Sequence, residues 1–463
     1  MPVVSHRLRA IWRKTFSLGW PVALQQSLNT LMRTVDILIT GFFSPAAVAA
    51  IGLADLYARI PLRLGKGLGS GAIAIASQET GRDSHHLRNQ AISQALLIGA
   101  LSGIPFVILG GFFGHTLIAI LGAESAVVTL GGIYLMIIFA VAPMRIVGFV
   151  GANAMQGTGD TRTPMAINAL ATILNILLSI ILGLGIWFVP TYGIIGVGIA
   201  TAIARTLEAG LFLAIFMSNH TTVSLSRPTD FTVARQILQV SGPDIAGGFG
   251  SELARFPFNA LLLLFGTEAN AAYHIANRLY QQFTAAIYRA FRTVATILVG
   301  QELGAGRADD ARYTARAICS LSIVILFGVG LLLFIGAGPL ALLFTREPLT
   351  VLYATEFNRV FALSMLFIAI YFPFAGALRG AGDTKTPFYA QLTGSYVFLL
   401  GISYLLAISL GFGLIGVYLG IISSYAARAA IVTGGFYWGS WPSLAERMIA
   451  EREAIEETRD DTS

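Results

Sequence analysis

The 463-residue sequence contains little charge and a single cysteine. Asp, Glu, Lys and Arg together make up 12% of the chain, about half the share found in ordinary soluble domains. Hydrophobic residues make up 55%, and the mean hydropathy is +0.73. The lone Cys319 excludes an internal disulfide framework. We therefore expect a protein embedded in a membrane.

Motifs for catalysis and for nucleic-acid binding are missing as well. The six histidines are scattered, and no His-Glu-x-x-His zinc motif is present. Although the formal net charge is +6, the basic residues form no solvated block with interleaved aromatic residues. We expect neither an enzyme nor a nucleic-acid-binding protein, and we expect no metal and no cofactor.

Long apolar runs dominate what the sequence does contain. A run of at least about 18 apolar residues can cross a bilayer as a helix. Twelve such spans are expected, near residues 16–42, 47–78, 90–113, 127–154, 163–189, 193–217, 233–265, 271–301, 311–340, 350–378, 386–411 and 413–438. The charged start of the chain leads into the first span without a small-residue cleavage site, so we expect no cleaved signal peptide.

The second half of the chain repeats the first. The phrase QGTGDTRTP at 156–164 returns as RGAGDTKTP at 379–387, displaced by 223 residues and identical at six of nine positions. The same displacement maps QETG at 78–81 onto QELG at 301–304. Six spans in each copy give parallel repeats, because an even number makes both halves enter the membrane in the same direction. Many secondary transporters consist of such repeats around a central site, so we expect function between the halves.

The repeated phrase predicts a tight turn followed by a helix. Its glycines would form the turn, Thr163 or Thr386 would cap the helix, and Pro164 or Pro387 would take the first helical position.

The loops between the spans predict the orientation and the division of the chain. Lys and Arg are concentrated in the loops on the side of the two termini, which places both termini in the cytoplasm. We expect an N-terminal lobe at 1–217, a cytoplasmic linker at 218–232, a C-terminal lobe at 233–440 and a charged cytoplasmic tail at 441–463.

Three motifs together resemble the multidrug and toxic compound extrusion (MATE) family. They are Gly-x-Gly-Asp-Thr after the fourth and tenth spans, Gln-Glu-x-Gly after the second and eighth, and Val35-Asp36-Ile37 in the first. The resemblance covers essentially the whole chain. It implies an all-α membrane protein with twelve transmembrane helices, arranged as two pseudo-symmetric six-helix lobes in a V around a central cleft. It also implies a plasma-membrane antiporter that exports small amphiphilic organic compounds in exchange for Na⁺ or H⁺. We expect a monomer.

Asp36 is the first candidate for cation coupling, because a charge inside a membrane is costly and points to function. The family resemblance adds Asn175 in the fifth span and Thr201 in the sixth. Archaeal-type relatives carry a second Asp four positions after Asn175, whereas this chain has Ser179, so proton and sodium both stay open as the coupling ion. A structural alternative is a buried ion pair between Asp36 and Arg33.

Taken together, the first, second, seventh and eighth spans contain more basic than acidic residues. One interpretation pairs Asp55 with Arg59 and Glu252 with Arg255 while the other bases reach toward the interface. The other interpretation is a basic cavity for an anionic or zwitterionic substrate, which makes an exporter or flippase of an anionic small molecule or lipid the alternative function. The substrate-cavity candidates are Arg33, Arg59, Arg63, Lys66, Glu252, Arg255, His274, Arg278, Arg289 and Arg292.

Overall fold

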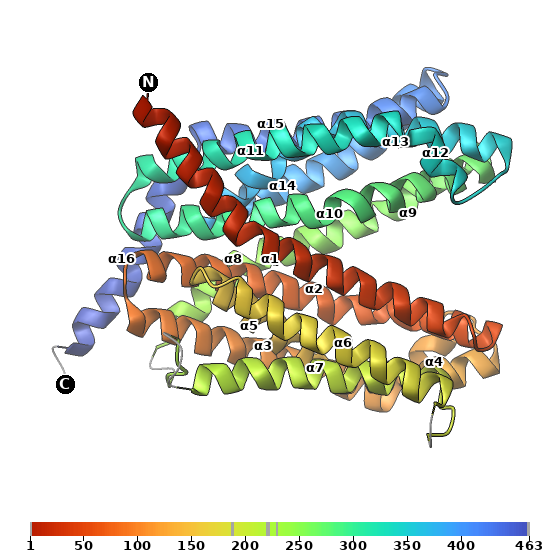
Figure 1. Ribbon diagram of the computed structural model, residues 1–463, viewed down its shortest axis with the longest axis horizontal. Helices are drawn as coiled ribbons and strands as arrows, with labels where there is room; N and C mark the ends of the chain where they lie inside the picture. Colours follow the sequence, from red (N-terminus) through yellow and green to blue (C-terminus); the bar gives the residue numbers. More distant parts are fainter. Residues whose placement is uncertain (1, 187–188, 219–222, 228–229, 461–463) are drawn as a thin grey trace. The chain divides into compact units, whose positions relative to one another are not determined.

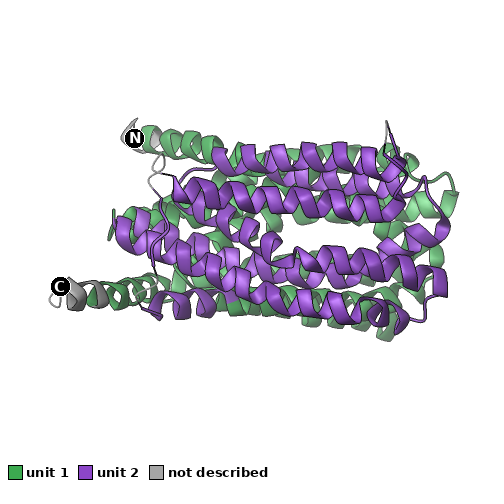
Figure 2. Ribbon diagram, turned by 90° about the horizontal axis from the view of Figure 1, so that it is seen from below, with its two compact units in different colours: residues 1–23, 81–83, 242–463 green, residues 24–80, 84–241 purple. Residues whose placement is uncertain are grey.

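The computed structural model describes residues 2–186, 189–218, 223–227 and 230–460 (Figure 1). All regular secondary structure within these ranges is helical, which confirms the predicted all-α class. Parts of the predicted linker (219–222 and 228–229) and the end of the predicted tail (461–463) lie outside the described residues. The chain divides into two compact units, drawn in different colours in Figure 2.

The first of these, here called the N-terminal unit, comprises residues 24–80 and 84–241. It contains the later part of α1 (Pro2–Thr40), nearly all of α2 (Pro45–Gly81), α3 (His85–Ala119), α4 (Ser125–Ala140), α5 (Ala142–Gly157), α6 (Arg162–Leu184), α7 (Gly193–Met217) and the start of α8 (Thr232–Leu253). Helix α3 packs against α4 and α5, and α7 packs against α4, α5 and α6. Helices α4 and α5 meet at a bend of 46° and form one broken span.

Small residues allow the close packing of α3 in this unit. A Cβ atom on Gly110 would lie 2.5 Å from Phe139 Cβ, and one on Gly114 would lie 2.9 Å from the Gly132 carbonyl oxygen. These glycines leave room for close approach of α4, as is common between helices in membranes.

The second unit, here called the C-terminal unit, comprises residues 1–23, 81–83 and 242–463. Its further helices are α9 (Arg255–Leu263), α10 (Thr267–Gly304), α11 (Ala308–Ile335), α12 (Ala337–Leu342), α13 (Pro348–Gly380), α14 (Lys385–Thr393), α15 (Leu414–Trp438) and α16 (Trp441–Asp460). Helix α14 continues into two π-helical segments, Gly394–Ile402 and Leu405–Ser409. Helix α13 is central, because it packs against α10, α11 and α15 (Figure 1).

The number of helices agrees with the twelve predicted spans. In the described part of the chain, eight helices are long and apolar enough to cross a membrane, and the bent α4–α5 pair makes a ninth. Helices α1 and α10 and the consecutive pair α8–α9 carry more charge than these but are of comparable length, and they complete the twelve.

The repeated phrase forms a turn, but its helix cap differs from the prediction. Helices α6 and α14 begin at Arg162 and Lys385, so Thr163 and Thr386 lie inside the first turn and do not cap it. Asp160 Oδ1 instead accepts hydrogen bonds from the backbone nitrogens of Arg162 and Thr163, both at 3.0 Å. Asp383 Oδ1 likewise accepts from the Thr386 nitrogen at 3.0 Å. An aspartate two residues before the helix therefore satisfies the free N–H groups.

Loss of this cap should weaken the N-terminal unit slightly. Asp160→Ala removes the acceptor for two backbone N–H groups, and we expect it to cost about 1 kcal/mol of stability. The apparent melting temperature of the purified protein in detergent measures the effect. Asp160→Asn keeps an oxygen at the same place and should melt close to wild type. Equal melting of all three proteins would show that the cap contributes nothing.

Candidate functional site

Three helices of the N-terminal unit each carry a stripe of polar residues through apolar sequence. Because the positions on each helix are spaced by three, four or seven residues, they share one face. They are Gln25, Asn29 and Asp36 on α1, Asn168, Thr172, Asn175 and Ser179 on α6, and Thr201, Arg205 and Glu208 on α7. All the listed residues of α6 and α7 are buried. Polar groups in such surroundings are costly unless they bond to one another.

At one end of the stripes, the side chains of all four predicted cation-coupling residues meet. Ser179 Oγ donates to Asp36 Oδ1 at 3.2 Å. The Asn175 amide satisfies its neighbours when its nitrogen donates to Asp36 Oδ1 at 3.3 Å and its oxygen accepts from Thr201 Oγ1 at 3.1 Å. Asp36 is half-buried, whereas Asn175 and Ser179 have no exposed surface. A carboxylate of α1 is thus held by donors from α6, which α7 in turn orients.

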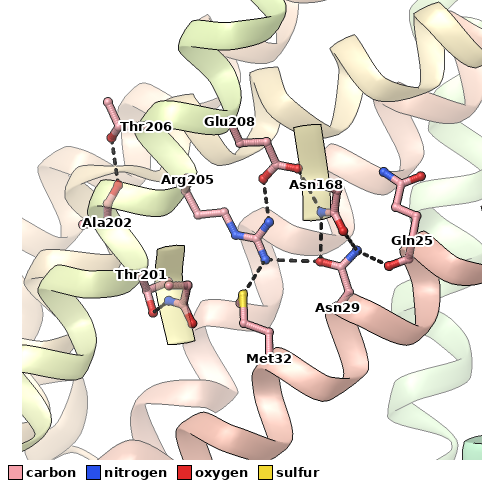
Figure 3. A network of polar contacts seen from close by, with 10 residues as sticks. Gln25, Asn29, Met32, Asn168, Thr201, Ala202, Arg205, Thr206 and Glu208 are labelled. Carbon is pink, nitrogen blue, oxygen red and sulfur yellow. Dashed lines mark hydrogen bonds and ion pairs between the residues drawn. The ribbon is translucent and has the colours of Figure 1, made fainter. Parts of the chain in front are cut away.

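A buried ion pair lies on α7 one to two helical turns after Thr201 (Figure 3). Arg205 Nη1 donates to Glu208 Oε2 at 2.6 Å, and both side chains are less than a tenth exposed. Arg205 Nη2 also donates to Asn29 Oδ1 at 3.3 Å, and Asn168 Nδ2 donates to Glu208 Oε1 at 3.1 Å. The pair therefore ties α7 to both α1 and α6.

The polar contacts continue to the repeated phrase. Gln156, the first residue of its first copy, donates from Nε2 to Gln25 Oε1 on α1 at 2.8 Å. Its counterpart Arg379 donates from Nε and Nη2 to Asp244 Oδ1 on α8 at 3.0 and 2.5 Å. The end of α5 is thus joined to α1 in the N-terminal unit, and the end of α13 is joined to α8 in the C-terminal unit.

Among the residues that it describes, the structure does not contain the ion pair between Asp36 and Arg33 that was the structural alternative for Asp36. Arg33 forms its ion pair with Asp55 on α2, at 3.2 Å between Nη2 and Oδ2, and not with Asp36. Both side chains of this pair are partly exposed. In the other unit, Glu252 and Arg255 form the expected pair at 3.3 Å.

The structure divides the ten substrate-cavity candidates between the two units. Arg33, Arg59, Arg63 and Lys66 lie in the N-terminal unit, and Glu252, Arg255, His274, Arg278, Arg289 and Arg292 lie in the C-terminal unit. Within the C-terminal unit, the Arg289 guanidinium lies 5.9 Å from the centre of the Tyr288 ring. Tyr288 stacks on Phe372, and the neighbouring Tyr280 stacks on Phe361. Arg289 is therefore a neighbour of aromatic rings of α10 and α13.

Arg205 and Glu208 were not among the residues predicted from the sequence. A usable signal was present, because two opposite charges three residues apart stand in an otherwise apolar span and follow Thr201 at helical spacing. For metals, no group of three or more His, Cys, Asp or Glu residues suited to an ion occurs in the ranges that the structure describes.

Comparisons with known proteins give one consistent family. The family model MatE matches residues 21–181 and 253–405. A probable multidrug resistance protein NorM from Thermotoga maritima is 23% identical over 451 residues, with 96% of each chain covered. The multidrug resistance protein MdtK from Pectobacterium atrosepticum is 26% identical, covering 86% of this chain and 88% of MdtK.

Solved structures agree in fold. An outward-facing multidrug resistance MATE family transporter of the MOP superfamily has a TM-score of 0.84 at 20% identity, covering 94% of this chain and 96% of that one. A MOP superfamily transporter from Pyrococcus furiosus, described with a binding pocket of reverse polarity, has a TM-score of 0.83 at 21% identity and covers 94% and 96% of the two chains.

Proposed function

Because the chain belongs to the MatE family, we propose that it is an antiporter that exports small amphiphilic organic compounds in exchange for protons. Its relatives NorM and MdtK are named as multidrug resistance proteins, which supports an efflux role. The proposal places the protein in the cell membrane as a monomer with both termini in the cytoplasm, working by alternating access of two lobes. It needs no cofactor besides the coupling ion.

The contacts of Asp36 carry the proposal. Both side chains that reach Asp36 Oδ1, those of Ser179 and Asn175, act as hydrogen-bond donors. Donors hold a carboxylate in place and leave its second oxygen to accept a proton. A sodium ion would instead need several oxygen atoms turned toward it, and the Asn175 oxygen is already used by Thr201. We therefore favour H⁺ over Na⁺ as the coupling ion.

In this mechanism, Asp36 carries one proton per cycle. The carboxyl group takes up a proton when the site faces outward and releases it when the site faces inward. Ser179 and Asn175 keep the group in one position, so that proton binding changes the charge of α1 without changing the packing around it. Because the protonated and the charged carboxyl group interact differently with the outward-facing and inward-facing states, the change of charge can shift the equilibrium between these two states.

Separate ion gradients test the proposal. Proteoliposomes containing the purified protein are given either an imposed pH gradient or an imposed Na⁺ gradient, and the movement of ethidium is followed by fluorescence. We expect the pH gradient to drive ethidium transport and the Na⁺ gradient to leave it at the level of protein-free vesicles. Transport driven by Na⁺ alone would replace the proton by sodium in the mechanism.

A second candidate function is export of an anionic compound. It is favoured by the basic residues of the C-terminal unit, where Arg428 lies 5.2 Å from the centre of the Tyr425 ring and Arg289 lies over Tyr288. The similar Pyrococcus furiosus transporter is described with reverse pocket polarity.

Substrate charge separates the two candidates. If Arg289 binds an anionic substrate, Arg289→Gln should weaken binding of an anionic compound about tenfold or more, since a bond to a charged group contributes about 1.5 to 3 kcal/mol. A cationic compound of similar size should bind as before or better. If Arg289→Gln binds both compounds as tightly as wild type does, the export of organic cations is the function that remains.

A further inference from the structure

The start of α1 is fastened to α11 within the C-terminal unit. Arg7 forms an ion pair with Asp310, and its guanidinium lies 4.4 Å from the centre of the Tyr313 ring. One to two turns later, Trp12 Nε1 donates to the Ala317 carbonyl oxygen at 2.9 Å. These contacts fix the position of the first turns of α1.

Beyond Trp12, the helices leave a cavity of about 270 Å³ between α1, α10 and α11. Its lining is apolar apart from Thr15 and includes Phe16, Gly19 and Trp20 on α1, Ala290 on α10 and Ile325 on α11. The space exists because Gly19 and Ala290 are small. Phe16 and Trp20 are 67% and 38% exposed, so apolar side chains that line the cavity reach the outside of the protein.

The length of the cavity suits one leaflet of a bilayer. Its lining on α1 runs from Thr15 to Ala23. Eight residues of helix rise about 12 Å, close to half of the roughly 30 Å hydrocarbon core. An acyl chain of a single leaflet would therefore lie along it.

Positive charge stands at one end of the cavity. Arg9 and Arg13 precede Phe16 and Trp20 at spacings of four, three and four, so these side chains form one stripe on α1. Both arginines are exposed. Like charges four residues apart on a helix repel each other, and a bound anion would relieve the repulsion.

A buried hydroxyl group lies at the same end. Thr15 is 2% exposed, and its Oγ1 has no hydrogen-bond partner among the described residues. Thr15 also lines the cavity. A buried polar atom without a partner is costly, and a ligand that supplies an acceptor there would gain the missing bond.

We propose that this cavity binds an anionic glycerophospholipid of the surrounding bilayer. One acyl chain lies between Phe16, Trp20 and Ala290, the Thr15 hydroxyl donates to an ester carbonyl at the glycerol, and Arg9 and Arg13 hold the phosphate. The lipid is a bound component of the C-terminal unit and not a transported substrate. The lipid stabilises the first half of α1, the helix whose second half carries Asp36. The proposed lipid site does not depend on which ion or substrate is transported.

Fluorescence quenching by lipids with brominated acyl chains tests the site. The protein is reconstituted in nanodiscs with increasing mole fractions of brominated phosphatidylglycerol or brominated phosphatidylcholine, and the contribution of Trp20 is obtained by subtracting the signal of Trp20→Phe. We expect the anionic lipid to reach half-maximal quenching of Trp20 at a roughly tenfold lower mole fraction, because two bases near a membrane surface each favour anionic lipid. Equal quenching curves for the two lipids would overturn the proposal.

Matched variants separate charge from shape. Arg9→Gln with Arg13→Gln should bring the two quenching curves together, whereas Lys14→Gln should not, because Lys14 has the same charge on another face of α1. Ala290→Phe should fill the cavity and abolish saturable quenching, while Val324→Phe, on an exposed part of α11 outside the cavity lining, should leave it unchanged. A preference for anionic lipid that survives loss of both arginines would overturn the proposal. So would quenching that disappears as protein copies are concentrated in one disc, since a second copy would then occupy the cavity.

Discussion

Asp36→Asn should abolish gradient-driven transport while leaving the protein folded. The amide has nearly the volume of the carboxyl group, and its oxygen can still accept the hydrogen bond that Ser179 Oγ donates to Asp36 Oδ1. The packing of α1 against α6 is therefore kept. An amide does not take up and release a proton, so the coupling step is lost. We expect ethidium transport under an imposed pH gradient to fall to the level of vesicles without protein.

Asp55→Asn is the matched control for this experiment. It removes a carboxylate of the same unit that pairs with Arg33, and both side chains of that pair are partly exposed. An exposed ion pair contributes about 1 kcal/mol or less, so this variant should keep most of its transport. Both variants should melt within a few degrees of wild type. Transport by Asp36→Asn at the wild-type rate would remove Asp36 from the coupling mechanism.

The membrane fold was largely predictable because bilayer thickness fixes the length of a span. The apolar runs predicted twelve spans, and the repeated phrase predicted two similar halves. The local backbone was less predictable. The break between α4 and α5 is marked in the sequence by Pro143, the second residue of α5, but the predicted span 127–154 runs across it. The residues of the π-helical segments after α14 do not distinguish a π-helix from an α-helix, because tertiary packing determines that choice. The predicted caps were wrong because Asp160, Thr161 and Thr163 all lie near the start of α6 and can each accept from its free N–H groups. Asp160 is the residue that accepts the hydrogen bond.

Long-range grouping was the hardest feature to predict. The predicted N-terminal lobe spans residues 1–217, and that boundary stays a prediction. The compact units nevertheless place 1–23 with the C-terminal unit. Contacts such as Arg7 with Asp310 join residues 303 positions apart. Periodicity within one helix carries no information about such a partner.

The candidate site was predicted in part. Asp36 was predicted from its charge inside an apolar span, and the family resemblance added Asn175, Ser179 and Thr201. The structure brings these four residues together, while their role in coupling stays a prediction. Arg205 and Glu208 were missed, because a pair of charges at i, i+3 is the usual pattern of a solvent-exposed helix face. The apolar sequence around the pair was the one signal of burial, and the packing of α7 against α6 shows that this face is buried.

The buried position of that pair predicts a large effect on stability. Glu208→Ala would leave the Arg205 guanidinium in an apolar interior without its carboxylate, and Asn168 would lose an acceptor. Breaking a buried ion pair on one side typically costs about 3 to 5 kcal/mol. For a unit of this size, we expect the apparent melting temperature in detergent to fall by roughly 10 °C.

Two comparisons identify the cause of that loss. Glu356→Ala breaks a pair with Arg359 at the same spacing, but those side chains are 40% and 45% exposed, so we expect a loss below about 1 kcal/mol. The double variant Arg205→Met with Glu208→Leu removes both charges and keeps apolar volume, and it should be more stable than Glu208→Ala because no uncompensated charge is left buried. If the double variant melts as low as the single one, the loss comes from the hydrogen bond between Asn168 and Glu208, which both variants lack, and the charge of Arg205 is not its cause.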